Sequence, residues 1–296
     1  MSKSFEQLGC SKINIGLAIT GKRDDGYHDI DTIFQSIRLS DSIYFAKHHS
    51  VVFSGGAPEL PDYMQKLVTY DEDNLSLKAL RAVQAYTGCK AGAAIHLLKR
   101  IPIQAGLGGG SADAAAMLLG LNRFWDLRLT QEELLKIGAT LGSDVPFLLQ
   151  GGTARGTGRG EILTELPEAP ELLLVLAKPK LEVATGWVYG NFRQQKVNQR
   201  PDIDGIIKAL EQSATGLLLE SCGNVLESVT IPAHPVIAEI KQKMLAAGAT
   251  CALMSGSGPT VFAVAEKKEI TERILTELSE LDLETAVTTT VQKERI

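Results

Sequence analysis

Residues 102–112 read Pro-Ile-Gln-Ala-Gly-Leu-Gly-Gly-Gly-Ser-Ala, and this glycine-rich stretch says most about the fold and chemistry of the chain. Four of the six positions from Gly106 to Ser111 lack a Cβ atom, so their backbone N–H groups can approach a ligand closely. The Ala- and Leu-rich run 111–125 predicts a helix, whose N-terminus adds unpaired N–H groups and a partial positive charge. Together these features predict a binding site for a phosphate-like oxyanion.

Two other interpretations of the glycines are weaker. A flexible connector is disfavoured because a predicted strand precedes the cluster and a predicted helix follows it. A dinucleotide-binding fingerprint needs G-x-G-x-x-G, and counting from Gly108 puts Asp113 where the last glycine belongs. Residues 16–23 match a P-loop only until Arg23 replaces the Ser or Thr that should hold magnesium, so a strand-to-turn junction is expected there.

Strand-like and helix-like patterns alternate along the whole chain and predict an α+β fold. Asn74 can cap one helix, and Thr130 and Glu133 have the spacing of a capping box before another. The acidic, proline-containing segment 165–171 is the predicted boundary between a domain of residues 1–165 and one of residues 166–296. The predicted strands are 12–19, 30–37, 43–45, 93–98, 172–177, 252–265 and 284–291, and the other predicted helices are 74–86, 130–141, 203–212, 235–246 and 269–278.

Bulk composition narrows the class of protein. The chain has 296 residues, 44% of them hydrophobic and 22% charged, which is typical of a globular protein. A net charge of −5 without any dense basic run argues against nucleic acid as a partner, and no apolar run is long enough to cross a membrane. The four cysteines show no C-x-x-C spacing, so we expect reduced thiols and a cytoplasmic protein. We also expect a monomer or a weak homodimer.

Lys12 and Asp144 are the candidates for chemistry at the phosphate site. Phosphoryl transfer depends on positioning and charge neutralisation, so a cation and a carboxylate should reach the loop. Strand alternation places Lys12 and Asn14 on one face, and the neighbouring isoleucines on the other. Asp144 precedes Val145-Pro146 and could equally be a helix N-cap, so its catalytic and capping roles both stay open.

Three segments together resemble the motifs of the GHMP kinases, the family of galactokinase, homoserine kinase, mevalonate kinase and phosphomevalonate kinase. They are Lys12-Ile13-Asn14, residues 102–112, and Ser255-Gly256-Ser257-Gly258-Pro259. The last segment alone could be a hairpin turn; with the others, a second glycine loop facing the first is expected. The resemblance implies an N-terminal ribosomal-protein S5 domain 2-like domain, a C-terminal ferredoxin-like domain, and an active site in the cleft between them.

The same resemblance implies ATP and Mg²⁺ as cofactors and assigns residues to them. Lys12 and Asp144 would be the catalytic pair, and Ser111 a ligand of the metal. The implied ATP-binding residues are Pro102, Ile103, Gln104, Ala105, Gly106, Leu107, Gly108, Gly109, Gly110, Ser111 and Ala112.

Within the family, Gly26-Tyr27-His28, the triple glycine and Gly142-Ser143-Asp144-Val145-Pro146 resemble the members that act on a cytidine diphosphate-linked methylerythritol. That likeness implies phosphorylation of its 2-hydroxyl group, a step in the non-mevalonate route to isoprenoid precursors. Tyr189 would stack on the base opposite Tyr27. The implied substrate-binding residues are Asn14, Tyr27, His28, Thr185 and Tyr189.

The chain departs from the family pattern in two places, and two alternative functions stay open. Cys10-Ser11 replaces the usual Pro-Ala before Lys12, and Ala112-Asp113 replaces the usual Ser-Asn after Ser111. The second replacement bears on the phosphate and magnesium contacts. Loop chemistry alone does not choose among alcohols, so homoserine or mevalonate is an alternative acceptor. A non-catalytic nucleotide-binding regulator is the other alternative, although retention of Lys12 and Asp144 argues against it.

Overall fold

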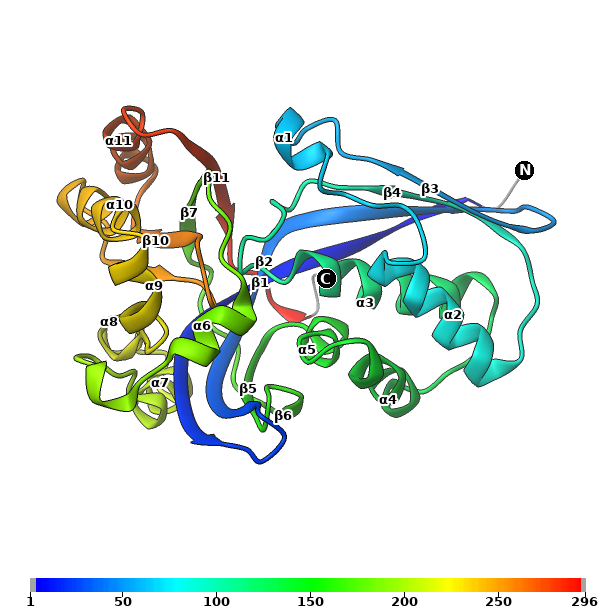
Figure 1. Ribbon diagram of the computed structural model, residues 1–296, viewed down its shortest axis with the longest axis horizontal. Helices are drawn as coiled ribbons and strands as arrows, with labels where there is room; N and C mark the ends of the chain where they lie inside the picture. Colours follow the sequence, from blue (N-terminus) through cyan, green and yellow to red (C-terminus); the bar gives the residue numbers. More distant parts are fainter. Residues whose placement is uncertain (1–3, 294–296) are drawn as a thin grey trace.

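The computed structural model describes residues 4–293, which form two halves, each built on one β-sheet (Figure 1). The larger sheet has seven strands in the order β3-β4-β2-β1-β8, with β5 paired to β2 and β6 to β5. Its strands are β1 (Phe5–Lys22), β2 (His28–Ala46), β3 (Val51–Gly56), β4 (Ala93–Leu98), β5 (Thr153–Thr157), β6 (Ile162–Glu165) and β8 (Gly223–Asn224).

The long antiparallel pair β1 and β2 runs from one end of the larger half to the base of the smaller half (Figure 1). Residues 16–22 of the failed P-loop match lie inside β1, and a turn follows at Arg23, so the expected strand-to-turn junction is confirmed. Two separate strands at 30–37 and 43–45 were expected, and that prediction is wrong because β2 is continuous. The polar segment 38–42 hid the continuity, although Asp41 and Ser42 are buried and paired with β1.

Helices cover one face of the larger sheet (Figure 1). As predicted, Asn74 caps α2 by accepting the N–H of Ser76, and Thr130 forms a capping box with Glu133 at the start of α4. The helix after the glycines begins at Gly109, earlier than expected, because glycines also adopt helical backbone angles. These helices are α2 (Leu75–Thr87), α3 (Gly109–Phe124), α4 (Gln131–Leu141) and α5 (Val145–Gln150); the short α1 (Asp62–Gln65) lies at the sheet edge.

Helix α3 lies very close to the sheet because small residues face it. A Cβ atom added to Gly9 of β1 would lie 2.7 Å from the carbonyl oxygen of Ala112 and 3.2 Å from the side chain of Ala116. Close packing of this kind fixes the helix tightly against its support. The first turn of α3, and the glycines that precede it, are therefore held against β1.

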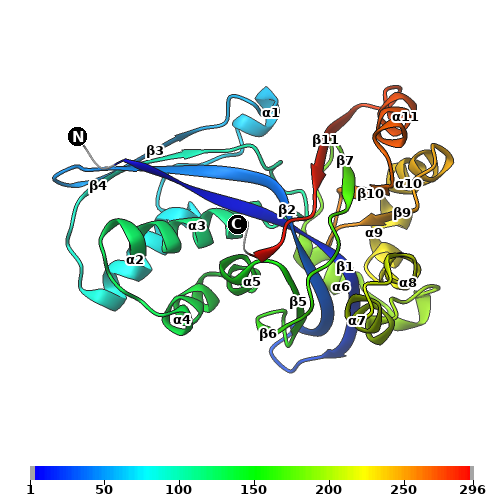
Figure 2. The same ribbon diagram turned by 180° about the vertical axis from the view of Figure 1, so that it is seen from behind.

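The smaller sheet is antiparallel with the order β11-β7-β10-β9, and helices α10 and α11 pack on its outer side (Figure 2). This arrangement confirms the predicted ferredoxin-like architecture and the α+β class. Its strands are β7 (Leu173–Pro179), β9 (Cys251–Met254), β10 (Val261–Ala265) and β11 (Leu283–Thr289). The helices that follow β7 in the chain are α6 (Thr185–Asn191), α7 (Ile203–Glu211), α8 (Thr215–Ser221), α9 (Glu227–Ala233), α10 (Val236–Ala246) and α11 (Lys268–Leu278), with a 3₁₀ turn at Gln194–Lys196. Of these, α7 contacts β1 and β2 of the larger sheet.

The two halves are joined closely. The predicted division after residue 165 falls between β6 of the larger sheet and β7 of the smaller one. It stays a prediction, because β8 returns to pair with β1 and one apolar cluster includes residues from both halves, such as Ile13 and Phe262. Across residues 4–293, none of the helices combines the length and the apolar character needed to span a membrane.

Candidate active site

A cavity of about 1,020 Å³ lies between the two halves and collects almost every residue that the sequence singled out. It is lined by Lys12 and Asn14 of β1, by the glycine loop, by Asp144, and by residues of α6. Leu107 and Ala112 are exceptions, since they do not line the cavity and their side chains are buried in the core. The lining also includes Tyr27, His28, Thr185, Tyr189, Pro102, Ile103, Gln104, Ala105, Gly106, Gly108, Gly109, Gly110 and Ser111.

The glycine loop has a backbone that only glycine adopts easily at two of its positions. Gly106 has φ +74° and Gly108 has φ +72°, both in the left-handed region. The loop is anchored to β1, because the backbone N–H of Lys12 donates to the carbonyl of Leu107 at 3.0 Å. Its last glycines form the first turn of α3, where the N–H groups have no partner within the helix. The result is a fixed concavity suited to an anion.

The segment Ser255–Gly258 faces this loop, as expected. It connects β9 to β10, so it is also the hairpin turn that the local sequence favoured. Ser255 Oγ donates to the carbonyl oxygen of Gly106 at 2.9 Å, and a Cβ atom on Gly106 would lie only 2.3 Å from the carbonyl oxygen of Ser255. The two backbones therefore touch.

Asn224 holds the second loop in place, a role that no sequence pattern indicated. Its amide nitrogen donates to the carbonyls of Met254 at 2.8 Å and Gly256 at 2.7 Å. Its amide oxygen accepts the N–H of Leu226 at 2.9 Å. Because Asn224 belongs to β8, these bonds connect the second loop to the edge of the larger sheet beside β1.

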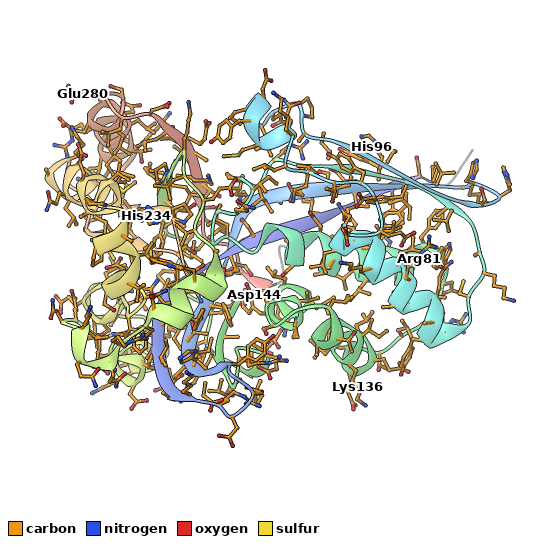
Figure 3. All side chains as sticks on the ribbon, in the orientation of Figure 1. Arg81, His96, Lys136, Asp144, His234 and Glu280 are labelled. Carbon is orange, nitrogen blue, oxygen red and sulfur yellow. The ribbon has the colours of Figure 1, made fainter. Side chains whose placement is uncertain are left out.

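Lys12 and Asp144 meet beside the loop. Lys12 Nζ lies 3.5 Å from Asp144 Oδ2, and it donates to Asn14 Oδ1 at 2.8 Å and to the carbonyl of Gly106 at 3.2 Å. Lys12 and Asn14 thus share one face of β1, as predicted. Asp144 occupies the N-cap position of α5, but its side chain makes no capping hydrogen bond there. Figure 3 shows Asp144 where the two halves meet, so its carboxylate is available to a ligand in the cavity.

A buried ionic cluster of Asp41, Lys99 and Asp113 supports the glycine loop, and the sequence reasoning missed it. Lys99 Nζ donates to Asp41 Oδ2 at 2.5 Å and to Asp113 Oδ2 at 2.6 Å. Burial alone would lower the pKa of Lys99, but the two carboxylates outweigh it and raise that pKa above its ordinary value. Burial also raises the pKa of Asp113 well above its usual range. The charge of Lys99 lowers that pKa in part, whereas Asp41 raises it further.

This cluster explains how the chain accommodates Asp113. The carboxylate is paired with Lys99, which belongs to the segment that leads into the loop, while Asp113 belongs to the helix that leaves it. Asp41 also accepts the backbone N–H of Ile101 at 2.9 Å. Both ends of the loop are therefore tied to the same buried charges.

Aromatic residues also line the cavity. Tyr27 follows Gly26 in a turn and is 58% exposed, while the rings of His28 and Tyr189 have centroids 5.7 Å apart. Burial, together with the nearby charge of Asp144, raises the pKa of the Tyr189 hydroxyl, and burial lowers the pKa of His28. Thr185 Oγ1 lies 3.0 Å from Ser257 Oγ, which brings α6 to the second glycine loop. A flat ring and a phosphorylated group could bind together in this space.

Comparisons with known proteins agree with this geometry. The family model for the GHMP kinases N terminal domain matches residues 74–152, and that for the GHMP kinases C terminal domain matches residues 199–281. The 4-diphosphocytidyl-2-C-methyl-D-erythritol kinase of Exiguobacterium sibiricum is 44% identical over 89% of this chain and 90% of its own. The enzyme of the same name from Enterococcus faecalis is 41% identical over 89% and 91%.

Solved structures show the same relationship. A crystal structure of 4-(cytidine 5'-diphospho)-2C-methyl-D-erythritol kinase is similar with a TM-score of 0.81 and 31% identity, covering 97% of this chain and 99% of that one. A homoserine kinase from Cytophaga hutchinsonii has a TM-score of 0.69 at 18% identity, covering 98% and 96% of the two chains. That lower identity shows a shared fold alone.

The contact between the two loops predicts opposite effects for two alanine substitutions. Gly106→Ala places a Cβ against the Ser255 backbone at positive φ, so we expect the free energy of unfolding to fall by about 1–3 kcal/mol. Gly110→Ala is the matched control, because a Cβ there meets nothing within 4 Å and the position is helical; its stability should stay equal or rise by up to ~1 kcal/mol. Urea unfolding of the ligand-free proteins measures both, and equal losses would contradict the loop contact.

Proposed function

The chain belongs to the GHMP kinase family, and from that premise we propose that it transfers the γ-phosphoryl group of ATP to the 2-hydroxyl group of 4-diphosphocytidyl-2-C-methyl-D-erythritol. The products are the 2-phosphate and ADP, on the non-mevalonate route to isoprenoid precursors. The observation that carries the proposal is the Lys12–Asp144 pair beside the glycine loop, in a chain 44% identical over 89% of its length to a kinase named for this substrate. A cytoplasmic location is part of the same proposal.

Asp144 is assigned as the base. Its carboxylate takes the proton of the substrate hydroxyl while the oxygen attacks the γ-phosphorus and the bond to the β-phosphate oxygen breaks. The N–H groups of Gly108–Ser111 and the ammonium of Lys12 stabilise the charge that spreads over the transferring group. Asn14 fixes the Lys12 ammonium through their 2.8 Å hydrogen bond, and Thr32 fixes Asn14 in turn.

One side-chain oxygen at the glycine loop suits a magnesium ion. The hydroxyl of Ser111 lines the cavity at the first turn of α3, and oxygen is the ligand that Mg²⁺ prefers. Ser111 would hold the ion together with the phosphates of ATP, and the bound ion would neutralise phosphate charge. The base of the substrate is assigned to Tyr27, His28 and Tyr189, and Thr185, which lines the cavity beside Ser257, is assigned to the substrate as well.

Acceptor choice tests the proposal directly. The purified protein is offered the cytidine diphosphate-linked alcohol, homoserine and mevalonate separately with Mg·ATP, and ADP formation is followed. We expect kcat/KM for the first substrate to exceed that for the others by on the order of 10²-fold or more, because the base pocket is left empty by the smaller alcohols. Preference for homoserine or mevalonate would refute the acceptor. ATP binding without turnover of any of them would favour a regulator.

Removal of the base gives a second prediction. Asp144→Asn keeps the shape of the side chain but cannot take a proton, so kcat should fall on the order of 10²–10⁴-fold with little change in KM for ATP. Asp126→Asn is the matched control, since Asp126 is exposed, lies outside the cavity and has a positive φ that asparagine tolerates. Near-normal turnover by Asp144→Asn would show that Asp144 is not the base and would assign it to helix capping.

A further inference from the structure

We propose that Cys222 and Cys251 form a reversible redox site, in which hydrogen peroxide converts the two thiols to a disulfide that disturbs the second glycine loop. The formation of this bond is independent of the proposed function. Only the expected effect on turnover rests on that function. The two cysteines lie far apart in the sequence, so no spacing pattern indicated the pair.

The two thiols meet where β8 lies beside β9. All four cysteines are free, and the Cys222 thiol is within hydrogen-bonding reach of Cys251 Sγ. Cys222 is buried in the main apolar cluster, and Cys251 packs against the same cluster from a half-buried position. Asn224, two residues after Cys222, donates at 2.8 Å to the carbonyl of Met254, three residues after Cys251. The backbone therefore holds the two cysteines together.

The surroundings of the two sulfur atoms give them different roles. The hydrogen bond from Cys222 lowers the pKa of Cys251, and Lys241 lowers it further, although burial and Glu227 oppose this. The same hydrogen bond, together with burial, raises the pKa of Cys222 well above its usual range. Because the thiolate is the nucleophile, Cys251 is the thiol that attacks an oxidant, and Cys222 is the resolving thiol.

A second cavity gives a small oxidant access to this region. It has a volume of about 550 Å³ and is lined by Glu220, close to Cys222, and by Thr250, which directly precedes Cys251. It shares no lining residue with the active-site cavity among the described residues. Glu266 also lines it, so the acidic wall disfavours an anionic oxidant such as glutathione disulfide. Neutral hydrogen peroxide meets no such barrier.

The oxidation takes place in two steps. The Cys251 thiolate attacks one oxygen of hydrogen peroxide, so that an S–O bond forms, the O–O bond breaks, and the hydroxide released takes up a proton to become water. The Cys222 sulfur then attacks the Cys251 sulfur of the sulfenic acid. The S–S bond forms as the S–O bond breaks, and the Cys222 proton leaves with the oxygen as a second water molecule. The two thiols lose two electrons in total, and the peroxide gains them.

The disulfide would act on both segments that position the second glycine loop. A disulfide joins its sulfur atoms at about 2.0 Å, well inside the contact distance of two thiols, so β8 and the start of β9 must shift against each other. Asn224 of β8 holds Gly256 at 2.7 Å, and β9 leads directly into Ser255. Ser255 in turn touches Gly106 of the first loop. A shift at the cysteines is therefore passed to the contact between the two loops.

Peptide mapping by mass spectrometry tests the bond itself. The purified full chain is treated with a small molar excess of hydrogen peroxide, its remaining thiols are alkylated, and it is digested without reductant. We expect one cross-linked pair of peptides that contains Cys222 and Cys251, and its loss on treatment with dithiothreitol.

Single substitutions test the two roles. Cys222→Ala removes the resolving thiol without adding a polar group to the core, so Cys251 should remain a sulfenic acid that dimedone labels. Cys251→Ser should leave Cys222 unoxidised, because it is buried and its pKa is raised. Cys89→Ser is the matched control, since Cys89 has a similar partial exposure and its loss should leave the cross-link unchanged.

Hydrogen exchange tests the effect on the loop without any substrate. We expect the amides of residues 255–258 to exchange faster in the oxidised protein than in the reduced one, and Cys251→Ser to show no such change. In turnover assays, oxidation should lower kcat/KM on the order of tenfold or more, as displacement of groups at an active site does. Dithiothreitol should restore it.

The outcomes that overturn the inference are distinct from those that overturn the function. A wild-type protein in which peroxide gives no Cys222–Cys251 cross-link would overturn the inference and leave the proposed function standing. A cross-link that leaves the exchange of residues 255–258 unchanged would overturn it as well. A reduced protein that fails to phosphorylate the cytidine-linked alcohol would overturn the function, while the mapping and the exchange would still decide the redox site.

Discussion

The carbonyl group of Gly106 is the point where the two halves of the protein and Lys12 meet. It accepts hydrogen bonds from Ser255 Oγ at 2.9 Å and from Lys12 Nζ at 3.2 Å. A side chain at Gly106 would separate the two loop backbones, so the absence of a Cβ allows the contact. This contact sets the distance between the glycine loop, the Lys12–Asp144 pair and the second loop. The same few atoms therefore define the cavity and the place that we propose for phosphoryl transfer.

Buried charges give this arrangement its rigidity. Asp41, Lys99 and Asp113 are each 4% exposed or less, and ionic groups in such a place are costly unless they are paired and hydrogen-bonded. Asp41 satisfies this condition by accepting both the Lys99 ammonium and backbone N–H groups at the start of the loop. Loss of one partner would leave an uncompensated buried charge and would lower the free energy of unfolding by about 3–5 kcal/mol. The cluster thus fixes both ends of the loop and still leaves the loop N–H groups free for a ligand.

Features of the site that depend on neighbouring residues could be predicted from the sequence. The glycine loop, the caps at Asn74 and Thr130, and the shared face of Lys12 and Asn14 all follow from short-range spacing. Contacts between distant segments could not be predicted: Lys99 and Asp41 are 58 positions apart, and Gly106 and Ser255 are 149 apart. Family resemblance supplied the folds assigned to the two domains, which periodicity alone did not. It could not supply Asn224, whose role arises from how β8 pairs with β1.

A crystal structure of the complex with Mg²⁺, a non-hydrolysable ATP analogue and the cytidine-linked alcohol would test this mechanism at the reacting atoms. We expect the triphosphate to lie on the N–H groups of Gly106–Ser111, with its γ-phosphate beside Lys12. The substrate 2-hydroxyl should then lie about 2.6–3.2 Å from the Asp144 carboxylate. A triphosphate bound elsewhere, or a 2-hydroxyl turned away from Asp144, would contradict it.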